Sequence, residues 1–198
     1  MRQRLERGLI QVYTGNNKGK TTAALGLALR ACGHGFQVYM ISFLKGSSYT
    51  GELYAAARLS PNLRIVQFGR NCPHASLIKE GFMKCTGCGE CFVKREEITG
   101  EDREKMALAF RHASEIILGG DHDIVILDEI LNAFKYGLLE VGEVVGLLKG
   151  KPEHVEVVLT GRDAPPEIIE MAHLVTEMAG IKHPFKDYGI AARRGIEY

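Results

Sequence analysis

The chain has 198 residues, 45% of them hydrophobic and 25% charged, which is the balance of an ordinary globular protein. Its formal net charge of +1 excludes a general electrostatic attraction to nucleic acid or to an anionic membrane, so neither is an expected partner. The N-terminal segment 1–7 is short and rich in charged residues, no apolar signal region follows it, and no run approaches the length of a membrane span. We therefore expect a cytoplasmic enzyme whose residues 1–198 form one domain.

Short apolar runs alternate with helix-like segments along the chain. The predicted strands are residues 9–13, 36–43, 64–68, 123–127, 155–160 and 173–178. The predicted helices are residues 20–32, 50–58, 101–118, 131–137, 140–149 and 165–172. Several of the strands are nearly continuous in Val, Ile and Leu, which is typical of strands buried on both faces of a parallel sheet. The alternation predicts a three-layer α/β fold with a mostly parallel sheet and ligands at the carboxyl ends of its strands.

The loop between the first predicted strand and the first predicted helix has the composition of a phosphate-binding loop. It reads Thr14-Gly15-Asn16-Asn17-Lys18-Gly19-Lys20-Thr21-Thr22. Backbone N–H groups of such a loop surround phosphate oxygens, Lys20 would reach the outer phosphates, and Thr21 would offer its hydroxyl to Mg²⁺. Three residues, not the usual four, separate Gly15 from Gly19. The flanking strand and helix nevertheless favour a nucleoside triphosphate site over an ordinary glycine-rich turn.

A later apolar run, residues 124–127, ends in Asp128 and Glu129. Carboxylates at the end of a parallel strand lie at the ligand edge of the sheet, where they bind Mg²⁺ directly or through water. Alone, this pattern would equally fit a strand that ends in two solvated acids. Together with Lys20 and Thr21 it predicts the second half of the nucleotide site.

Two arginines are further candidates for contact with phosphate. Arg162 follows the strand predicted at 155–160, so it lies at the same edge of the sheet. There it either neutralises phosphate charge or is a surface residue beside a turn, and both interpretations stay open. Arg30 is the weaker candidate, because the usual place of such a residue is the solvated face of a helix.

Residues 69–100 break the alternation and are predicted to form an inserted loop, too long for a plain connection. They contain Cys72, Cys85, Cys88 and Cys91. In a cytosolic protein such a group indicates metal binding before it indicates disulfides. Four thiolates complete either a Zn²⁺ site or an iron–sulfur cluster, and the triplet 85–91 is closer to the cluster-binding run of ferredoxins than to paired zinc knuckles. A segment without metal remains the third alternative.

Seven segments carry a resemblance to a known family. In order they are 14–24 (TGNNKGKTTAA), 30–35 (RACGHG), 43–46 (FLKG), 126–130 (ILDEI), 159–162 (LTGR), 182–185 (KHPF) and 195–198 (GIEY). They resemble the P-loop-type corrinoid (cob(I)alamin) adenosyltransferases, and they span nearly the whole chain apart from the cysteine segment. The resemblance implies a RecA-like α/β domain that is usually a homodimer.

The implied reaction is transfer of the 5′-deoxyadenosyl group of ATP to a reduced corrinoid, with release of triphosphate. In that family the short loop holds ATP in the reverse direction compared with kinases. Cobalt(I) is itself the nucleophile, so the protein must align C5′ with cobalt and stabilise the charge on the leaving triphosphate. The expected groups are Lys20, the amides of 15–21, and Mg²⁺ on Thr21 and Glu129, with Asp128 as a further carboxylate. An electron donor for Co(II) is also implied, which gives a redox cluster at the cysteines a rationale.

The chain departs from the family pattern in two places. Asn17 stands where the family usually has glycine, and asparagine tolerates left-handed backbone better than other non-glycine residues. The family also has a Phe and a Trp, two residues apart, that displace the lower ligand of cobalt. This chain has no Trp. Phe92 is the positional candidate for the Phe, and Lys94 stands at the Trp position.

Two other functions remain alternatives. A nucleoside kinase of the thymidine kinase type also combines a P-loop domain with four cysteines, although there the cysteines should form two separate pairs. A nucleotide-gated metal or corrinoid chaperone would use the same loop without catalysis. The product discriminates between them, because a kinase releases ADP and an adenosyltransferase releases triphosphate.

Overall fold

A computed structural model describes residues 4–198, so residues 1–3, where the charged N-terminal segment begins, lie outside it. Its centre is a six-stranded sheet in the order β3-β2-β4-β5-β1-β6, with every neighbouring pair parallel. The strands are β1 (Ile10–Thr14), β2 (Val38–Phe43), β3 (Leu63–Phe68), β4 (Ile124–Asp128), β5 (Glu156–Thr160) and β6 (Leu174–Glu177). The predicted parallel α/β fold is confirmed.

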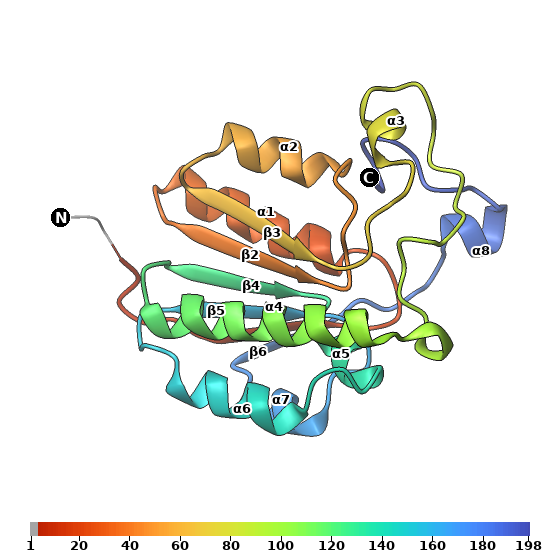
Figure 1. Ribbon diagram of the computed structural model, residues 1–198. Coiled ribbons are helices and arrows are strands. Elements are labelled where there is room, and N and C mark those ends of the chain that lie inside the picture. The colour runs from red at the N-terminus through yellow and green to blue at the C-terminus, as the bar shows by residue number, and fades with distance from the viewer. Residues whose placement is uncertain (1–3) are drawn as a thin grey trace.

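Helices cover both faces of this sheet and give the molecule three layers (Figure 1). On one face lie α1 (Lys20–Gly33) and α2 (Gly51–Arg58). On the other lie α4 (Gly100–Gly119), α5 (Ile130–Lys135), α6 (Val141–Gly150) and α7 (Pro166–Met171). Two short helices, α3 (Ala75–Lys79) and α8 (Pro184–Tyr188), lie at the end to which the strands point, and so does the C-terminus.

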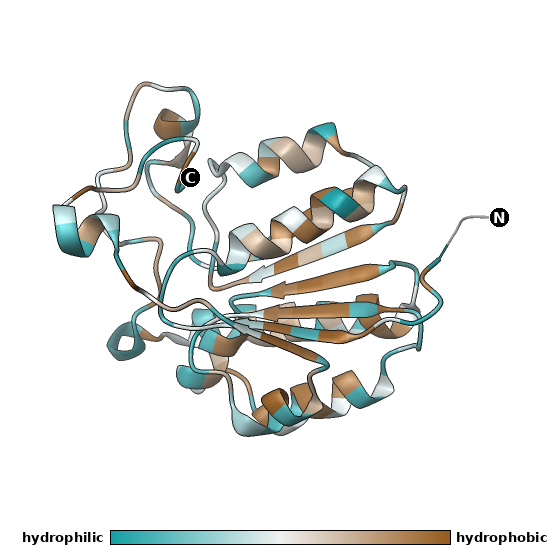
Figure 2. Ribbon diagram, turned by 180° about the vertical axis from the view of Figure 1, so that it is seen from behind, coloured by the Kyte–Doolittle hydropathy of each residue, from teal (hydrophilic) through white to brown (hydrophobic). Residues whose placement is uncertain are grey.

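The central strands are buried on both faces, which explains their continuous apolar runs. Along β4, Val125 and Leu127 pack under the helices of the α4 side, whereas Ile124 and Ile126 pack under α1. Figure 2 shows these strands mostly in brown, between helices of mixed teal, white and brown. Full burial of each such side chain contributes about 1.5–3 kcal/mol, so the two cores fix the sheet and the position of its carboxyl edge.

The N-terminus of α4 is tied to the segment 69–100 by one buried carboxylate. Asp102, 3% exposed, forms a capping box with Thr99 at the start of α4. The same carboxylate accepts hydrogen bonds from Arg70 Nε at 3.0 Å and from an Arg70 terminal nitrogen at 2.7 Å. This bidentate pair joins Arg70, two residues after β3, to the helix that follows the segment.

The predicted helices and strands are present within about two residues of their expected ends. Three elements were not predicted: α3, the 3₁₀ turn η1 (Arg95–Glu97) and α8. Each is five residues or shorter, too short to show helical periodicity. The interpretation of 69–100 as an insert stays a prediction. No helix within residues 4–198 is both long and apolar enough to cross a membrane.

Candidate functional site

The loop from Gly15 to Gly19 joins the end of β1 to the start of α1, as the sequence predicted. Both glycines have positive φ, 102° and 116°, values that L side chains rarely adopt. A Cβ on Gly15 would also lie 2.7 Å from the carbonyl oxygen of Met178, after β6. Asn17 is not among the described residues with positive φ, so the loop closes without the left-handed asparagine that we anticipated.

Lys20 is folded into the loop and is only 6% exposed. Its Nζ donates hydrogen bonds to the carbonyl oxygens of Gly15 and Asn17, each at 2.7 Å. Burial lowers the pKa of this lysine, and the nearby Glu129 carboxylate partly opposes that effect. The ammonium therefore lies at the centre of the loop, in reach of any anion that the loop amides bind.

The fully buried carboxylate of Asp128 is the centre of a polar network at the sheet edge. Its Oδ1 accepts hydrogen bonds from Thr21 at 2.8 Å and from Thr160 at 2.7 Å. Its Oδ2 accepts one from Lys45 Nζ at 2.7 Å. Because β5 lies next to β4, Thr160 at the end of β5 reaches the acidic end of that strand.

Glu129 turns out of β4 with a positive φ of 63°, which is uncommon for a residue with a side chain. Its backbone N–H donates to Thr160 Oγ1 at 2.9 Å, and Asn132 donates its side-chain amide to the Glu129 carboxylate. Burial raises the pKa of Glu129, and the neighbouring Asp128 raises it further. The two acids are thus held side by side by neighbours that stabilise the strained turn.

A cavity of about 1010 Å³ opens above this network. The predicted residues that line it are Asn16, Asn17, Lys18, Gly19, Lys20, Thr21, Thr22, Phe92, Glu129 and Arg162. Gly15 and Asp128 are not part of its lining, although both bond directly to residues that are. Arg30 is exposed in the last turn of α1 and does not line the cavity, which argues against its predicted contact with phosphate.

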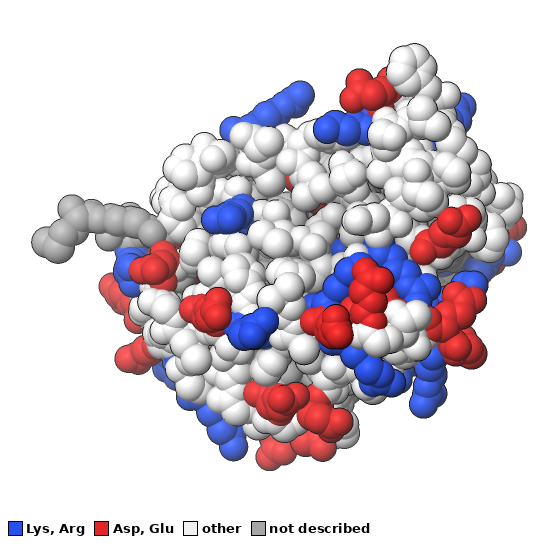
Figure 3. All heavy atoms as spheres, in the orientation of Figure 1, with Lys and Arg blue, Asp and Glu red and all other residues white. Residues whose placement is uncertain are grey.

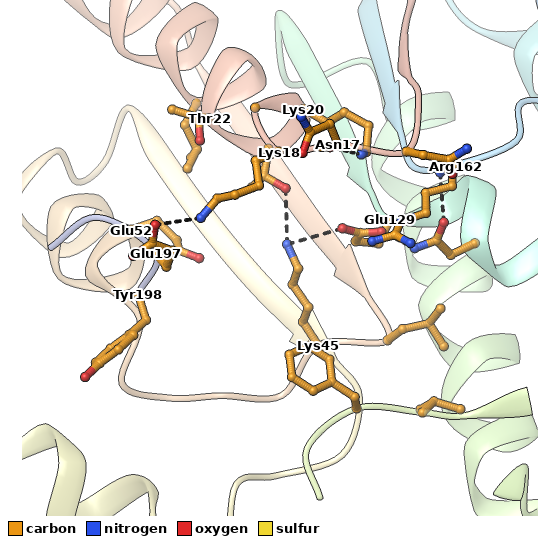
Figure 4. Close-up of a pocket in the computed structure, with 18 of the residues that line it drawn as sticks. Asn17, Lys18, Lys20, Thr22, Lys45, Glu52, Glu129, Arg162, Glu197 and Tyr198 are labelled. Carbon is orange, nitrogen blue, oxygen red and sulfur yellow. Dashed lines mark hydrogen bonds and ion pairs between the residues drawn. The ribbon is translucent and has the colours of Figure 1, made fainter. Parts of the chain in front are cut away.

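Arg162 reaches the cavity from a tight turn after β5. Its backbone N–H donates to the Asn132 side chain at 2.8 Å. The preceding Gly161 has a φ of 145°, and a Cβ there would lie 2.6 Å from the Cβ of Leu131. Figure 4 shows the Arg162 side chain beside Glu129, across the cavity from Lys18. Of the two interpretations of Arg162, this placement favours contact with a ligand.

The C-terminal residues 195–198 form another wall of the cavity. Glu197 accepts a hydrogen bond from Lys18 Nζ at 2.7 Å and also pairs with Arg193 (Figure 4). These hydrogen bonds, that from Arg193 foremost, lower the pKa of Glu197 to about 2. The ring of Tyr198 packs edge-on against Tyr49, with centroids 5.4 Å apart. The tail thereby connects the phosphate-binding loop to the cysteine segment.

Cys72 and Cys91 are buried with Tyr49 and Ile78 in a small apolar cluster, and Cys85 packs against its edge. We call these five residues the thiol cluster. Burial raises the pKa of Cys91, as it does that of Tyr49. Cys88 is exposed. Across residues 4–198 no group of three or more His, Cys, Asp or Glu side chains is arranged to hold a metal ion, so the predicted four-cysteine centre is not assembled here.

Several residues at the site had no predicted role. Lys45 follows β2, Thr160 ends β5, and Asn132 lies one turn after Glu129. Lys45 and Thr160 belong to segments that carried the family resemblance, and each is a polar residue at the carboxyl end of a parallel strand. That position was the available signal. The contact of the tail with the loop has no comparable signal in the sequence.

The charges around the cavity are mixed. Its lining includes both basic and acidic side chains, Lys18, Lys20, Lys45 and Arg162 beside Glu52, Glu129 and Glu197 (Figure 4). Outside it, acidic and basic side chains are interspersed on the face drawn in Figure 3. The site combines the first turn of a helix, a buried lysine and a pair of carboxylates. Together these groups are suited to binding a phosphate chain with its counter-cation.

Comparison with known proteins agrees with this geometry. The family model described as ATP:corrinoid adenosyltransferase BtuR/CobO/CobP matches residues 6–198. A corrinoid adenosyltransferase of Sinorhizobium sp is 38% identical over 194 residues, which cover 98% of this chain and 81% of the relative. Corrinoid adenosyltransferases of Escherichia coli K12 and Pseudomonas aeruginosa are 37% and 35% identical, each over 98% of this chain and over 87% and 85% of their own lengths. The chain therefore belongs to the ATP:corrinoid adenosyltransferase family.

Proposed function

We propose that this protein transfers the 5′-deoxyadenosyl group of ATP to the cobalt of a reduced corrinoid and releases triphosphate. The observation that carries the proposal is the family match over residues 6–198, which includes every residue of the cavity wall. The cavity supports it further. Its volume of about 1010 Å³ lies at the upper end of ordinary ligand pockets, with room for a nucleotide and part of a second substrate.

The reaction is a displacement at C5′. Cobalt(I) supplies the electron pair of the new Co–C5′ bond and is formally oxidised to Co(III). The C5′–O5′ bond breaks, and its electron pair leaves with the triphosphate. The protein contributes by aligning C5′ with cobalt and by stabilising the charge that gathers on the leaving oxygen.

The phosphate-binding loop supplies that stabilisation in our proposal. The amides from Gly15 to Thr22 surround the triphosphate, and the Lys20 ammonium turns from the loop carbonyls to phosphate oxygens. Lys18 and Arg162 add positive charge from opposite walls of the cavity. In a buried site such preorganised donors need little rearrangement when the transition state forms.

The residues present fit Mg²⁺. A threonine hydroxyl and two carboxylates are hard oxygen ligands, and Mg²⁺ commonly uses one or two carboxylates with substrate phosphates and water. Thr21, Glu129 and Asp128 would hold the ion. When bound, it would supply charge neutralisation to the triphosphate.

The corrinoid would enter from the side of the cavity formed by Phe92 to Glu96. Phe92 is 62% exposed and lines the cavity, so its ring is available to a planar substrate. We propose that Phe92 contacts the lower face of the corrinoid. Lys94, at the position of the family's Trp, also lines the cavity but pairs with Glu97 at 2.9 Å. It offers no aromatic surface.

We further propose that residues 1–198 act as one domain in a homodimer and that a separate reductant supplies electrons to Co(II). Light scattering on the purified protein would test the dimer. Metal analysis after anaerobic purification would test for iron or zinc. We assign no step of the reaction to a metal at the cysteines, because their ligand set is not assembled within the described residues.

The decisive experiment is an anaerobic assay with ATP, Mg²⁺ and a chemically reduced corrinoid. We expect the absorbance of an adenosylated corrinoid to appear with one triphosphate per adenosyl group. Release of ADP with a nucleoside acceptor would instead favour a kinase of the thymidine kinase type. Tight binding of ATP without either product would favour a chaperone.

A further inference from the structure

We propose that Lys45 is a built-in cation at the magnesium position. Its ammonium holds the metal-binding oxygens together until a divalent ion, arriving with nucleotide, displaces it toward the phosphate chain. The inference rests on the proposed ATP site. It adds that the Lys45 ammonium and the divalent ion compete for the same oxygens of that site.

Lys45 contacts the same side chains to which we assign the metal ion. Its Nζ lies 2.7 Å from Asp128 Oδ2, 3.2 Å from Thr21 Oγ1 and 3.9 Å from Glu129 Oε1. These are the three side chains that would hold Mg²⁺. The Lys45 ammonium thus lies against two carboxylates, and opposite charges at this range favour its charged form.

The backbone around Lys45 is closely packed and includes a residue with positive φ. The preceding Leu44 has a positive φ of 61°, which is strained for a branched residue. A Cβ on Gly69 would lie 2.5 Å from the Lys45 nitrogen, and a Cβ on Gly46 would lie 2.5 Å from the Arg70 carbonyl oxygen. Two chain segments therefore cross where only glycine leaves room. This crossing fixes the backbone on both sides of Lys45.

Electrostatic repulsion prevents the Lys45 ammonium and a divalent ion from binding the same oxygens at the same time. The fully buried Asp128 and the adjacent Glu129 carry two negative charges, and the ammonium offsets one of them. A divalent ion on the same oxygens would lie within a few ångström of the ammonium, where repulsion is strong at a partly buried site. Without nucleotide the protein should therefore bind divalent ions weakly. A triphosphate changes this balance, since it brings additional metal ligands and a new partner for the lysine.

The test measures metal binding without turnover. Free Mn²⁺ is counted by electron paramagnetic resonance in titrations of nucleotide-free wild type, Lys45→Met and the control Lys105→Met. Lys105 pairs with Glu101 at 2.6 Å on α4, so the control removes a lysine–glutamate pair outside the cavity. We expect Lys45→Met to bind Mn²⁺ about tenfold or more tightly than wild type, and the control to match wild type. Equal Mn²⁺ affinity of Lys45→Met and wild type would overturn the proposal.

Thermal unfolding gives an independent readout. In EDTA, Lys45→Met should unfold at a lower temperature than wild type, because two adjacent carboxylates lose their cation. Added Mn²⁺ should raise the unfolding temperature of Lys45→Met more than that of wild type. A larger rise for wild type would contradict the inference. Lys45→Gln keeps a hydrogen-bond donor without charge and replaces Lys45→Met in both measurements if the latter does not fold. Failure of wild type to bind ATP would refute the proposed function, whereas normal ATP binding with unchanged Mn²⁺ affinity in the variants would refute only this inference.

Discussion

The sheet edge around Asp128 and the segment 69–100 both border the cavity region, yet they are held in different ways. At the sheet edge, Thr21, Thr160 and Lys45 converge on one buried carboxylate, and each comes from or directly follows an element packed in the main core. The segment 69–100 contains only α3 and η1, and it rests on the thiol cluster and the Arg70–Asp102 pair. The first region has its geometry imposed by the sheet. The second depends on a few local contacts, so it is the place where this chain can change its substrate contacts at little cost to the fold.

The strongest test of the sheet-edge region is Lys20→Ala. Loss of an ammonium that stabilises the leaving triphosphate should reduce adenosylation about 100- to 1,000-fold. The anaerobic assay measures this, with Lys105→Ala as the matched control on α4. Near-normal turnover by Lys20→Ala would show that the loop is not part of the proposed site.

Cutting the pair that anchors the segment 69–100 to α4 should have the next largest effect. Asp102→Asn loses the bidentate partner of Arg70 and weakens the cap of α4, so we expect about 2 kcal/mol lower stability. The hydrogen bonds from Arg70 hold the pKa of Asp102 well below its usual range. A depressed carboxyl pKa stabilises the fold above the unfolded value of about 4, and this contribution is lost as pH falls below it. Denaturant unfolding at neutral pH and at low pH should therefore show the gap between wild type and Asp102→Asn narrowing in acid. A gap independent of pH would show that Asp102 acts through packing alone.

A smaller effect is expected from Glu129→Gln, which leaves Asp128 and its network in place. Activity should require more Mg²⁺, because one anionic oxygen ligand is lost. Titration of the rate with Mg²⁺ measures this shift. An unchanged Mg²⁺ requirement would indicate that Asp128 is the only one of the two carboxylates that binds the metal.

Substitutions of the cysteines are expected to have the smallest effects, and they distinguish a packing role from metal binding. If the thiol cluster acts by packing, Cys91→Ala should cost about 1 kcal/mol and Cys88→Ser, at an exposed position, almost nothing. If a metal centre forms on all four, both variants should lose metal and impair corrinoid use more than ATP binding. Metal analysis and unfolding curves of the two variants decide between these outcomes, and a brown colour that bleaches with dithionite would identify a cluster.

Sequence reasoning predicted the sheet because burial dictates the composition of its strands, and it predicted the loop because the backbone conformation there requires glycine. Strands such as 124–127 must be continuous in apolar residues between two helical layers, and a loop that curls around an anion needs Gly15 and Gly19 at positive φ. The roles of Lys45 and Thr160 were missed because they depend on strand order, which places β4 between β2 and β5. The contact between Lys18 and Glu197 spans 179 positions and depends on the path of an irregular tail. No local pattern carries that information.

The position of the tail has a practical consequence for anyone producing this protein. Tyr198 is both a wall of the cavity and a neighbour of Tyr49, whereas the described chain begins at the opposite end of the sheet (Figure 1). A purification tag fused after Tyr198 would emerge beside the cavity, where it would compete with the proposed nucleotide for space. The same tag placed at the other end would leave the cavity untouched, so the choice of fusion site alone can decide whether a preparation is active.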